Sequence, residues 1–112
     1  AQKIVVERDM HGDNQALHPV VRTHLNSGKK SLFVNPGFTS HLDGFTYDES
    51  SVILKFLYDH CTKPEFIYRH TWKKGDLLIW DNRVLMHYAI MDYPDDQGRY
   101  MERCTVIGEK PF

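Results

Sequence analysis

The sequence lacks long apolar runs and has no excess of charge of either sign. None of its apolar stretches approaches the roughly 18–20 consecutive residues that a membrane-spanning helix needs. The chain has 14 Lys and Arg residues against 15 Asp and Glu, a formal charge of −1, and so offers no basic surface for nucleic acid or an anionic membrane. We therefore expect a soluble protein that binds neither nucleic acid nor membranes.

Cysteine is also scarce, and secretion signals are missing. The two cysteines, Cys61 and Cys104, form no CxxC pair, and no apolar signal segment stands at the N-terminus. These absences favour a reduced, cytoplasmic compartment. The sequence has no internal repeat, low-complexity tract or linker, and its 112 residues allow one domain core at most. Because it begins at Ala1 without an initiator methionine, we expect a piece of a longer protein.

Short alternating runs of apolar residues dominate the chain and predict about seven strands. Turn-forming residues separate several of these runs, most clearly at 26–29, 73–76 and 94–98. The predicted strands lie at 4–6, 19–23, 31–34, 66–72, 77–80, 84–90 and 102–107.

One segment has helical periodicity instead. Thr46 and Glu49 have the spacing of a capping box, and apolar residues then recur at helical intervals as far as Cys61, before Pro64 ends the pattern. This predicts one amphipathic helix at about 48–61 packed on a sheet. The expected fold is mainly β with one or two helices, as in a sandwich or jelly-roll.

A candidate metal ligand lies in the predicted strand at 84–90. His87 shares a face with Leu85 and Ala89 in a strand of period two, which favours an inward orientation. A lone histidine on such a strand is more often a buried side chain satisfied by a hydrogen bond. Both interpretations stay open on this pattern alone.

Two arginines follow on the next predicted strand. Arg99 and Arg103 are four residues apart, which places both guanidinium groups on one face. If the turn at 94–98 folds this strand back, His87 and both arginines can face a common cavity. The planar guanidinium suits carboxylates and sulfonates, and two inward arginines would need anions to pair with. A strand that faces solvent is the alternative.

Five stretches, in order and spacing, carry a resemblance to a known family. They are HPVVRTH (18–24), SLFVNPGFT (31–39), TKPEF (62–66), GDLLIWDNRVLMHYA (75–89) and RYMERCTVIGEKPF (99–112). Together they resemble the C-terminal portion of the taurine dioxygenase (TauD/TfdA) family of Fe(II)- and 2-oxoglutarate-dependent oxygenases. The resemblance implies a double-stranded β-helix, the jelly-roll variant of clavaminate synthase-like enzymes. Residues 1–112 would then be the C-terminal part of a single dioxygenase domain.

The resemblance also implies roles for particular residues. His87 matches the distal histidine ligand of the iron, and Arg99 matches the arginine that holds the distal carboxylate of 2-oxoglutarate. Arg103 matches the arginine near both the substrate's acidic group and the inner carboxylate of 2-oxoglutarate. Phe38 matches an aromatic residue that lines the substrate pocket. The segment 80–83 is interpreted as scaffolding, a polar turn that leads into the strand of His87.

Family chemistry implies the reaction. Iron held by two histidines and one carboxylate leaves positions open for 2-oxoglutarate and dioxygen. The expected substrate is a small anionic, sulfonate-like molecule such as taurine, hydroxylated while 2-oxoglutarate is converted to succinate and carbon dioxide. A homo-oligomer is a further expectation.

The other two metal ligands are not evident in the sequence. The family's proximal HxD or HxE motif stands much farther before the distal histidine than the 86 residues that precede His87, so we expect it before Ala1. Two in-chain pairs have the right form, His11 with Asp13 and His41 with Asp43. With seven histidines and 15 acidic residues, about one such pair is expected by chance, so both are interpreted as coincidences.

Two functions follow as hypotheses. The first is a 2-oxoglutarate-dependent dioxygenase, of which this chain is one part. The second is a truncated, non-catalytic β-domain with a binding or oligomerisation role, favoured by the short length and the missing ligands. Half a jelly-roll exposes the inner face of its sheet, so either hypothesis requires another chain segment or a partner to cover it.

Overall fold

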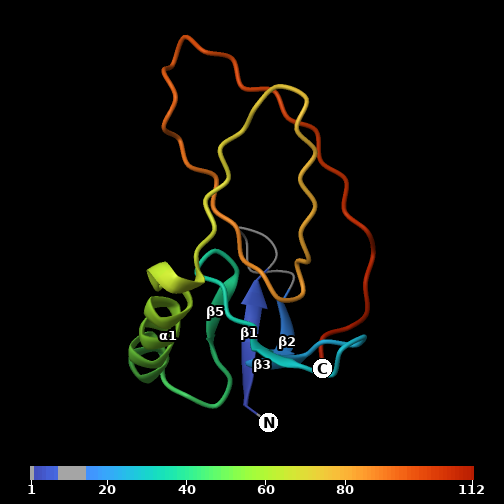
Figure 1. Ribbon diagram of the computed structural model, residues 1–112. Helices are drawn as coiled ribbons and strands as arrows, with labels where there is room; N and C mark the ends of the chain where they lie inside the picture. The colour runs from blue at the N-terminus through green and yellow to red at the C-terminus, as the bar shows by residue number, and fades with distance from the viewer. Residues whose placement is uncertain (1, 8–14) are drawn as a thin grey trace.

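The computed structural model describes residues 2–7 and 15–112 (Figure 1). Strands β1 (Lys3–Glu7), β2 (Gln15–Pro19) and β5 (Thr39–Leu42) form an antiparallel sheet in the order β2-β1-β5. Strands β3 (Val21–Thr23) and β4 (Lys30–Leu32) form a separate hairpin. Helix α1 (Tyr47–Cys61) packs against β5, and the short 3₁₀ helix η1 (Pro64–Phe66) follows it. Within the described ranges no helix is long and apolar enough to cross a membrane.

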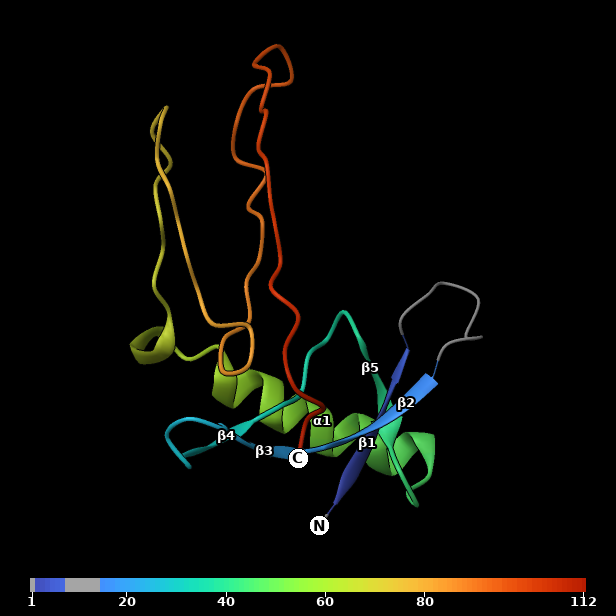
Figure 2. The ribbon, with the colours of Figure 1, turned by 90° about the vertical axis from the view of Figure 1, so that its right-hand side faces the viewer.

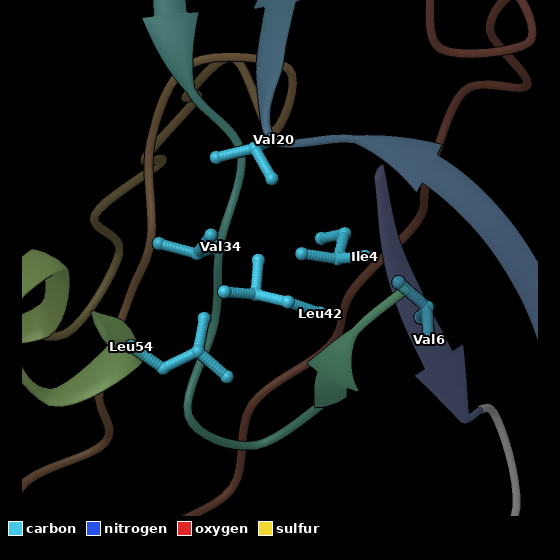
Figure 3. Packing of buried hydrophobic residues seen from close by; sticks show 6 residues of the cluster. All are labelled: Ile4, Val6, Val20, Val34, Leu42 and Leu54. Atoms are coloured by element: carbon cyan, nitrogen blue, oxygen red, sulfur yellow. The ribbon is translucent and has the colours of Figure 1, made fainter. Parts of the chain in front are cut away.

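A small apolar core joins both sheets to the helix. Its buried members are Ile4, Val6, Val20, Val34, Leu42 and Leu54 (Figure 3). Strand β1 is central in its sheet, which explains why its run of apolar residues is buried. Val20 lies between β2 and β3 and connects the two sheets, since its N–H donates to Gln2 and its carbonyl accepts from Phe33.

The predicted helix is confirmed, one residue longer than expected at its start. Thr46 Oγ1 accepts a hydrogen bond from the Glu49 N–H at 3.2 Å, and the Glu49 carboxylate accepts from the Thr46 N–H at 2.9 Å. This capping box satisfies two backbone N–H groups that the first turn leaves without helical partners. Asp48 and Glu49 in the first turn and His60 in the last turn complement the helix dipole.

The N-terminal strand predictions are confirmed in part. The strands predicted at 4–6 and 31–34 correspond to β1 and β4, and the turn at 26–29 connects β3 to β4 with Gly28 at a φ of +69°. The strand predicted at 19–23 is split at Val20 into the end of β2 and all of β3. Residues 15–18 and β5 were not predicted because their sequences, QALH and TSHL, lack a clear apolar alternation.

Four predicted strands are wrong for this structure: 66–72, 77–80, 84–90 and 102–107. The chain beyond η1 has no strand within the described residues, because its extended segments form no ladder of backbone hydrogen bonds with a neighbour. The two predicted turns do form, with Asp76 N–H donating to Lys73 and Gln97 N–H donating to Pro94.

The chain beyond η1 therefore makes two long excursions, which we call the first (67–80) and second (84–108) excursion. Both rise from the same side of the sheets, and each reverses at a predicted turn (Figure 2). The arms of the second excursion are splayed apart (Figure 1). Many of its apolar side chains face solvent, and Tyr88, Val106 and Ile107 are 86, 91 and 96% exposed.

Removing the Ser50 hydroxyl should destabilise the junction between α1 and β5. Ser50 is 1% exposed, and its Oγ accepts a hydrogen bond from the Leu42 N–H at 3.1 Å. Ser50→Ala leaves this N–H buried without a partner, at a cost of about 1–3 kcal/mol. Urea unfolding followed by far-UV circular dichroism measures the loss. Ser51→Ala makes the same chemical change at the next, exposed position of α1 and serves as the control. Equal effects of the two substitutions would contradict the assigned role of the hydroxyl.

Candidate functional site

The segment that precedes His87 is a tight polar turn, as predicted. The Val84 and Leu85 N–H groups both donate to the Asp81 carbonyl, at 3.2 and 3.1 Å. Asp81 Oδ1 accepts from the Arg83 backbone N–H at 2.9 Å, which closes the turn from the side-chain side. The Trp80 indole N–H donates to Asn82 Oδ1 at 2.6 Å.

The Asp81 carboxylate also forms an ion pair with the Arg83 side chain. Arg83 Nε donates to Oδ1 and Nη2 donates to Oδ2, each at 2.9 Å, which is the bidentate geometry that guanidinium groups favour. These hydrogen bonds from Arg83, with a further one from His24, hold the pKa of Asp81 far below its ordinary value. The same contact with Asp81 raises the pKa of Arg83.

His24, just after β3, ties this turn to the β3-β4 hairpin. Its Nε2 lies 3.0 Å from Asp81 Oδ2, and its Nδ1 lies 3.2 Å from the Ser27 backbone nitrogen. Because a backbone N–H can only donate, Nδ1 is the accepting nitrogen. The proton of the neutral ring is therefore on Nε2, from which it is donated to Asp81.

A buried arginine joins β3 to the C-terminal end of the chain. Arg22 is 6% exposed; its Nη2 donates to Glu109 at 3.1 Å and its guanidinium lies 4.7 Å from the centre of the Phe33 ring. Glu109 also lies 3.7 Å from Arg83. A hydrogen bond from its own backbone N–H, followed by the contacts with both arginines, lowers the pKa of Glu109 against the opposing effect of desolvation.

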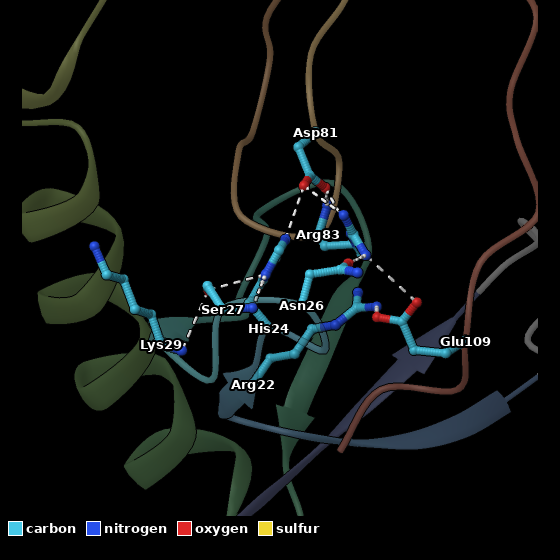
Figure 4. A network of polar contacts seen from close by, with 8 residues as sticks. All are labelled: Arg22, His24, Asn26, Ser27, Lys29, Asp81, Arg83 and Glu109. Carbon is cyan, nitrogen blue, oxygen red and sulfur yellow. Dashed lines mark hydrogen bonds and ion pairs between the residues drawn. The ribbon is translucent and has the colours of Figure 1, made fainter.

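We call Arg22, His24, Asp81, Arg83 and Glu109 the base cluster (Figure 4). The sequence predicted the turn that contains two of its members. The other three lie in stretches that support the family resemblance, but a single charged residue in a sequence does not indicate its partner. Glu109 is 87 residues from Arg22.

His87 is located at the start of the second excursion. Its side chain is exposed, in contrast to the inward orientation that the alternation favoured, because its segment has no neighbouring strand in the described structure. The ring lies 5.0 Å from that of Trp80. Within the described residues the imidazole makes no hydrogen bond, so neither ring nitrogen is engaged.

The two arginines and Phe38 are also exposed. Arg99 Nε donates to Met101 Sδ at 3.0 Å, and its guanidinium lies 5.6 Å from the Tyr93 ring centre. Arg103 makes no hydrogen bond or ion pair within the described part of the chain. The structure thus brings neither arginine into contact with His87. Phe38, 59% exposed, lies in a turn in which its N–H donates to Asn35.

A complete metal site is not formed by the described residues. No group of three or more His, Cys, Asp or Glu side chains lies close enough to hold an ion in the ranges 2–7 and 15–112. His41 is part of β5, where its ring contacts Tyr47. The pair His11 and Asp13 lies outside the described residues. The unengaged imidazole of His87 fits a role as one nitrogen ligand, and two more ligands would be required.

Comparison with known proteins decides the family. A family model described as "Taurine catabolism dioxygenase TauD, TfdA family" matches residues 4–105. The chain belongs to the TauD/TfdA family. The predicted resemblance is thereby confirmed.

Curated TauD/TfdA relatives extend well beyond this chain. An α-ketoglutarate-dependent dioxygenase, cnsP, of Penicillium expansum is 41% identical over 99% of this chain and 30% of its own length. The α-ketoglutarate-dependent 2,4-dichlorophenoxyacetate dioxygenase of Burkholderia sp. (strain RASC) is 40% identical over 82% of this chain and 30% of its own length. The chain therefore spans less than a third of these relatives.

A solved TauD/TfdA structure supports the fold class. A taurine dioxygenase from Burkholderia xenovorans matches 67% of this chain and 27% of its own length, with a TM-score of 0.62 and 33% identity. The fold is therefore mainly β with one α-helix and forms part of a jelly-roll, as predicted.

The lowered pKa of Asp81 predicts a pH-dependent contribution to stability. A carboxyl group whose pKa falls on folding stabilises the protein above its ordinary value of 3.8, and this contribution is lost as the pH drops below that value. Asp81→Asn should lower the urea midpoint at about pH 7, and the difference from the wild type should shrink below about pH 4. Urea titrations across this range provide the measurement. A difference that stays constant with pH would rule out the ionised carboxylate as its source.

Proposed function

We propose that the complete protein containing this chain is an Fe(II)- and 2-oxoglutarate-dependent dioxygenase that hydroxylates a small anionic substrate. Residues 1–112 would form the C-terminal part of its single catalytic domain. The observation that carries the proposal is the TauD/TfdA match over residues 4–105, a range that includes His87, Arg99 and Arg103. The dioxygenase names of the relatives support the reaction class.

Each proposed site residue has the chemistry that its role requires. His87 would supply one imidazole ligand to Fe(II), and no hydrogen bond within the described residues competes for its ring nitrogens. The terminal nitrogens of Arg99 would hold the distal carboxylate of 2-oxoglutarate, since only its Nε is used in the contact with Met101. Bound Fe(II) and 2-oxoglutarate would supply the oxidising chemistry, with succinate and carbon dioxide as products.

The substrate is proposed to be a small anion of the sulfonate type, such as taurine. Arg103 would neutralise its acidic group and the inner carboxylate of 2-oxoglutarate, while Phe38 would contribute an apolar wall. One relative is named for taurine and another for 2,4-dichlorophenoxyacetate, a sulfonate and a carboxylate respectively. Both names support an anionic substrate, and arginine binds either group.

The exposed excursions support a larger domain. Side chains such as Tyr88 and Ile107 leave apolar surface in solvent, and the backbone beside them has no strand neighbour within the described residues. We propose that the rest of the domain pairs with these segments and supplies the two remaining metal ligands. A truncated, non-catalytic β-domain with a binding or oligomerisation role is the second candidate. It is favoured because, within the described residues, no three His, Cys, Asp or Glu side chains lie close enough to hold a metal ion.

Formation of the iron complex with 2-oxoglutarate tests the proposal. Anaerobic Fe(II) and 2-oxoglutarate added to the complete protein should give the weak visible charge-transfer band of the chelate. Arg99→Ala should reduce this band by about tenfold or more at the same 2-oxoglutarate concentration, because a charged hydrogen-bonded contact is lost. Arg69→Ala is the matched control, since Arg69 lies in the first excursion and forms an exposed ion pair with Asp92.

The same titration separates the two candidates. The dioxygenase proposal predicts a band from the complete protein and none from residues 1–112 alone, because the described residues form no group of three or more candidate metal ligands. Absence of a band from the complete protein would exclude the dioxygenase and favour the non-catalytic domain. A band from residues 1–112 alone would show that the missing ligands lie within this chain.

A further inference from the structure

The second excursion leaves and rejoins the folded part of the chain at one place. Asp81 and Arg83 immediately precede it, and Glu109 immediately follows it. Arg83 lies 3.7 Å from Glu109, so the two ends of the excursion contact each other directly. The contact between Arg83 and Glu109 in the base cluster (Figure 4) thus closes a loop. By their positions in the sequence, His87, Arg99 and Arg103 lie within this loop.

Both ends are also attached to the β3-β4 hairpin. The leading end is held by His24, which contacts Asp81, and by Asn26, whose Oδ1 accepts from Arg83 Nη1 at 3.0 Å. The trailing end is held by the Arg22 pair with Glu109 and by the hydrogen bond from the Thr23 N–H to the Phe112 carbonyl at 2.7 Å. The separation of the two arms at their base is therefore fixed by one short hairpin.

We propose that the base cluster positions the iron ligand His87 relative to the 2-oxoglutarate-binding arginines. This inference rests on the proposed function. The members of the cluster contact neither His87 nor the two arginines, so they act through the arms and are positioning residues.

His87 and Arg103 both lie a short distance along the chain from the base cluster. His87 is four residues from Arg83, and Arg103 is six residues from Glu109. At about 3.3 Å per extended residue, these side chains lie no more than about 13 and 20 Å along the chain from the cluster. A shift of one arm at its base moves His87 relative to Arg103, and misplacement by about 1 Å can reduce activity strongly.

Glu109 connects the two arginines of the base cluster. Its carboxylate bridges Arg22, on β3, and Arg83, at the leading end of the second excursion. Arg22 is buried and Glu109 is its only ion-pair partner among the described residues. Removal of the Glu109 charge would leave a buried guanidinium without a counter-charge, which favours movement of the trailing arm.

The test uses the complete protein with Glu109→Gln, which keeps the size of the side chain and an accepting oxygen but removes the charge. We expect 2-oxoglutarate affinity, measured by the charge-transfer band, to fall about tenfold or more, as for other groups that orient metal ligands indirectly. We also expect more succinate to form per hydroxylated product. Glu109→Asp keeps the charge and should restore part of both properties. Asp59→Asn, which removes the charge from an exposed ion pair with Lys55 on α1, should change neither.

Unfolding measurements separate positioning from stability. If Glu109→Gln lowers the urea midpoint but leaves the affinity and the product ratio at wild-type values, the inference is overturned. If Glu109→Gln does not fold, Arg83→Lys replaces it, because lysine keeps the charge but loses the bidentate contact with Asp81; unchanged affinity and product ratio in that variant also overturn the inference. A wild-type protein without a charge-transfer band would instead defeat the proposed function.

Discussion

The ion pair between Arg22 and Glu109 is the constraint on which the C-terminal half of the structure depends. A buried guanidinium requires a counter-charge, and Glu109 supplies it from the far end of the chain. The same carboxylate approaches Arg83, which grips Asp81 and so shapes the turn before His87. Through Glu109, both ends of the second excursion are therefore linked to one buried charge on a three-residue strand, while His24 and Asn26 also hold the leading end.

Between these fixed ends the chain has no such constraint. The excursions carry the apolar alternation of strands, yet their backbone groups form no ladder within the described residues and their side chains remain exposed. Backbone N–H and C=O groups require partners, which water supplies in an exposed segment and a neighbouring strand supplies in a sheet. The match to this chain covers only 30% of the length of each of the two TauD/TfdA relatives that we compared, so both relatives are much longer than this chain. The additional length is where we propose that these neighbours lie.

Local signals in the sequence predicted local structure well. The capping box of Thr46 and Glu49 and the helical period placed α1 to within one residue, and Gly28 marked the turn between β3 and β4. Strand β5 was missed because its four residues are held by pairing with β1, a non-local interaction that cannot be predicted from the sequence TSHL. The strands predicted after η1 do not form for the opposite reason. Their apolar alternation is present in the sequence, but the described structure contains no neighbouring strand with which they pair.

In the candidate site, too, the local features could be predicted from the sequence and the long-range contacts could not. The turn at 80–83 could be predicted from its polar residues, whereas the contact of His24 with this turn and the ion pair of Arg22 with Glu109 depend on tertiary structure. The roles of His87, Arg99, Arg103 and Phe38 came from the family resemblance rather than from spacing, and they remain proposals.

The central claim is that the second excursion forms sheet strands once the rest of the domain is present, with its ends held by the base cluster. Hydrogen–deuterium exchange, compared between residues 1–112 and the complete protein, tests it most directly. The account predicts rapid exchange of the backbone amides at 84–90 and 102–107 in the isolated chain and strong protection of the same amides in the complete protein. Rapid exchange in both proteins would contradict it.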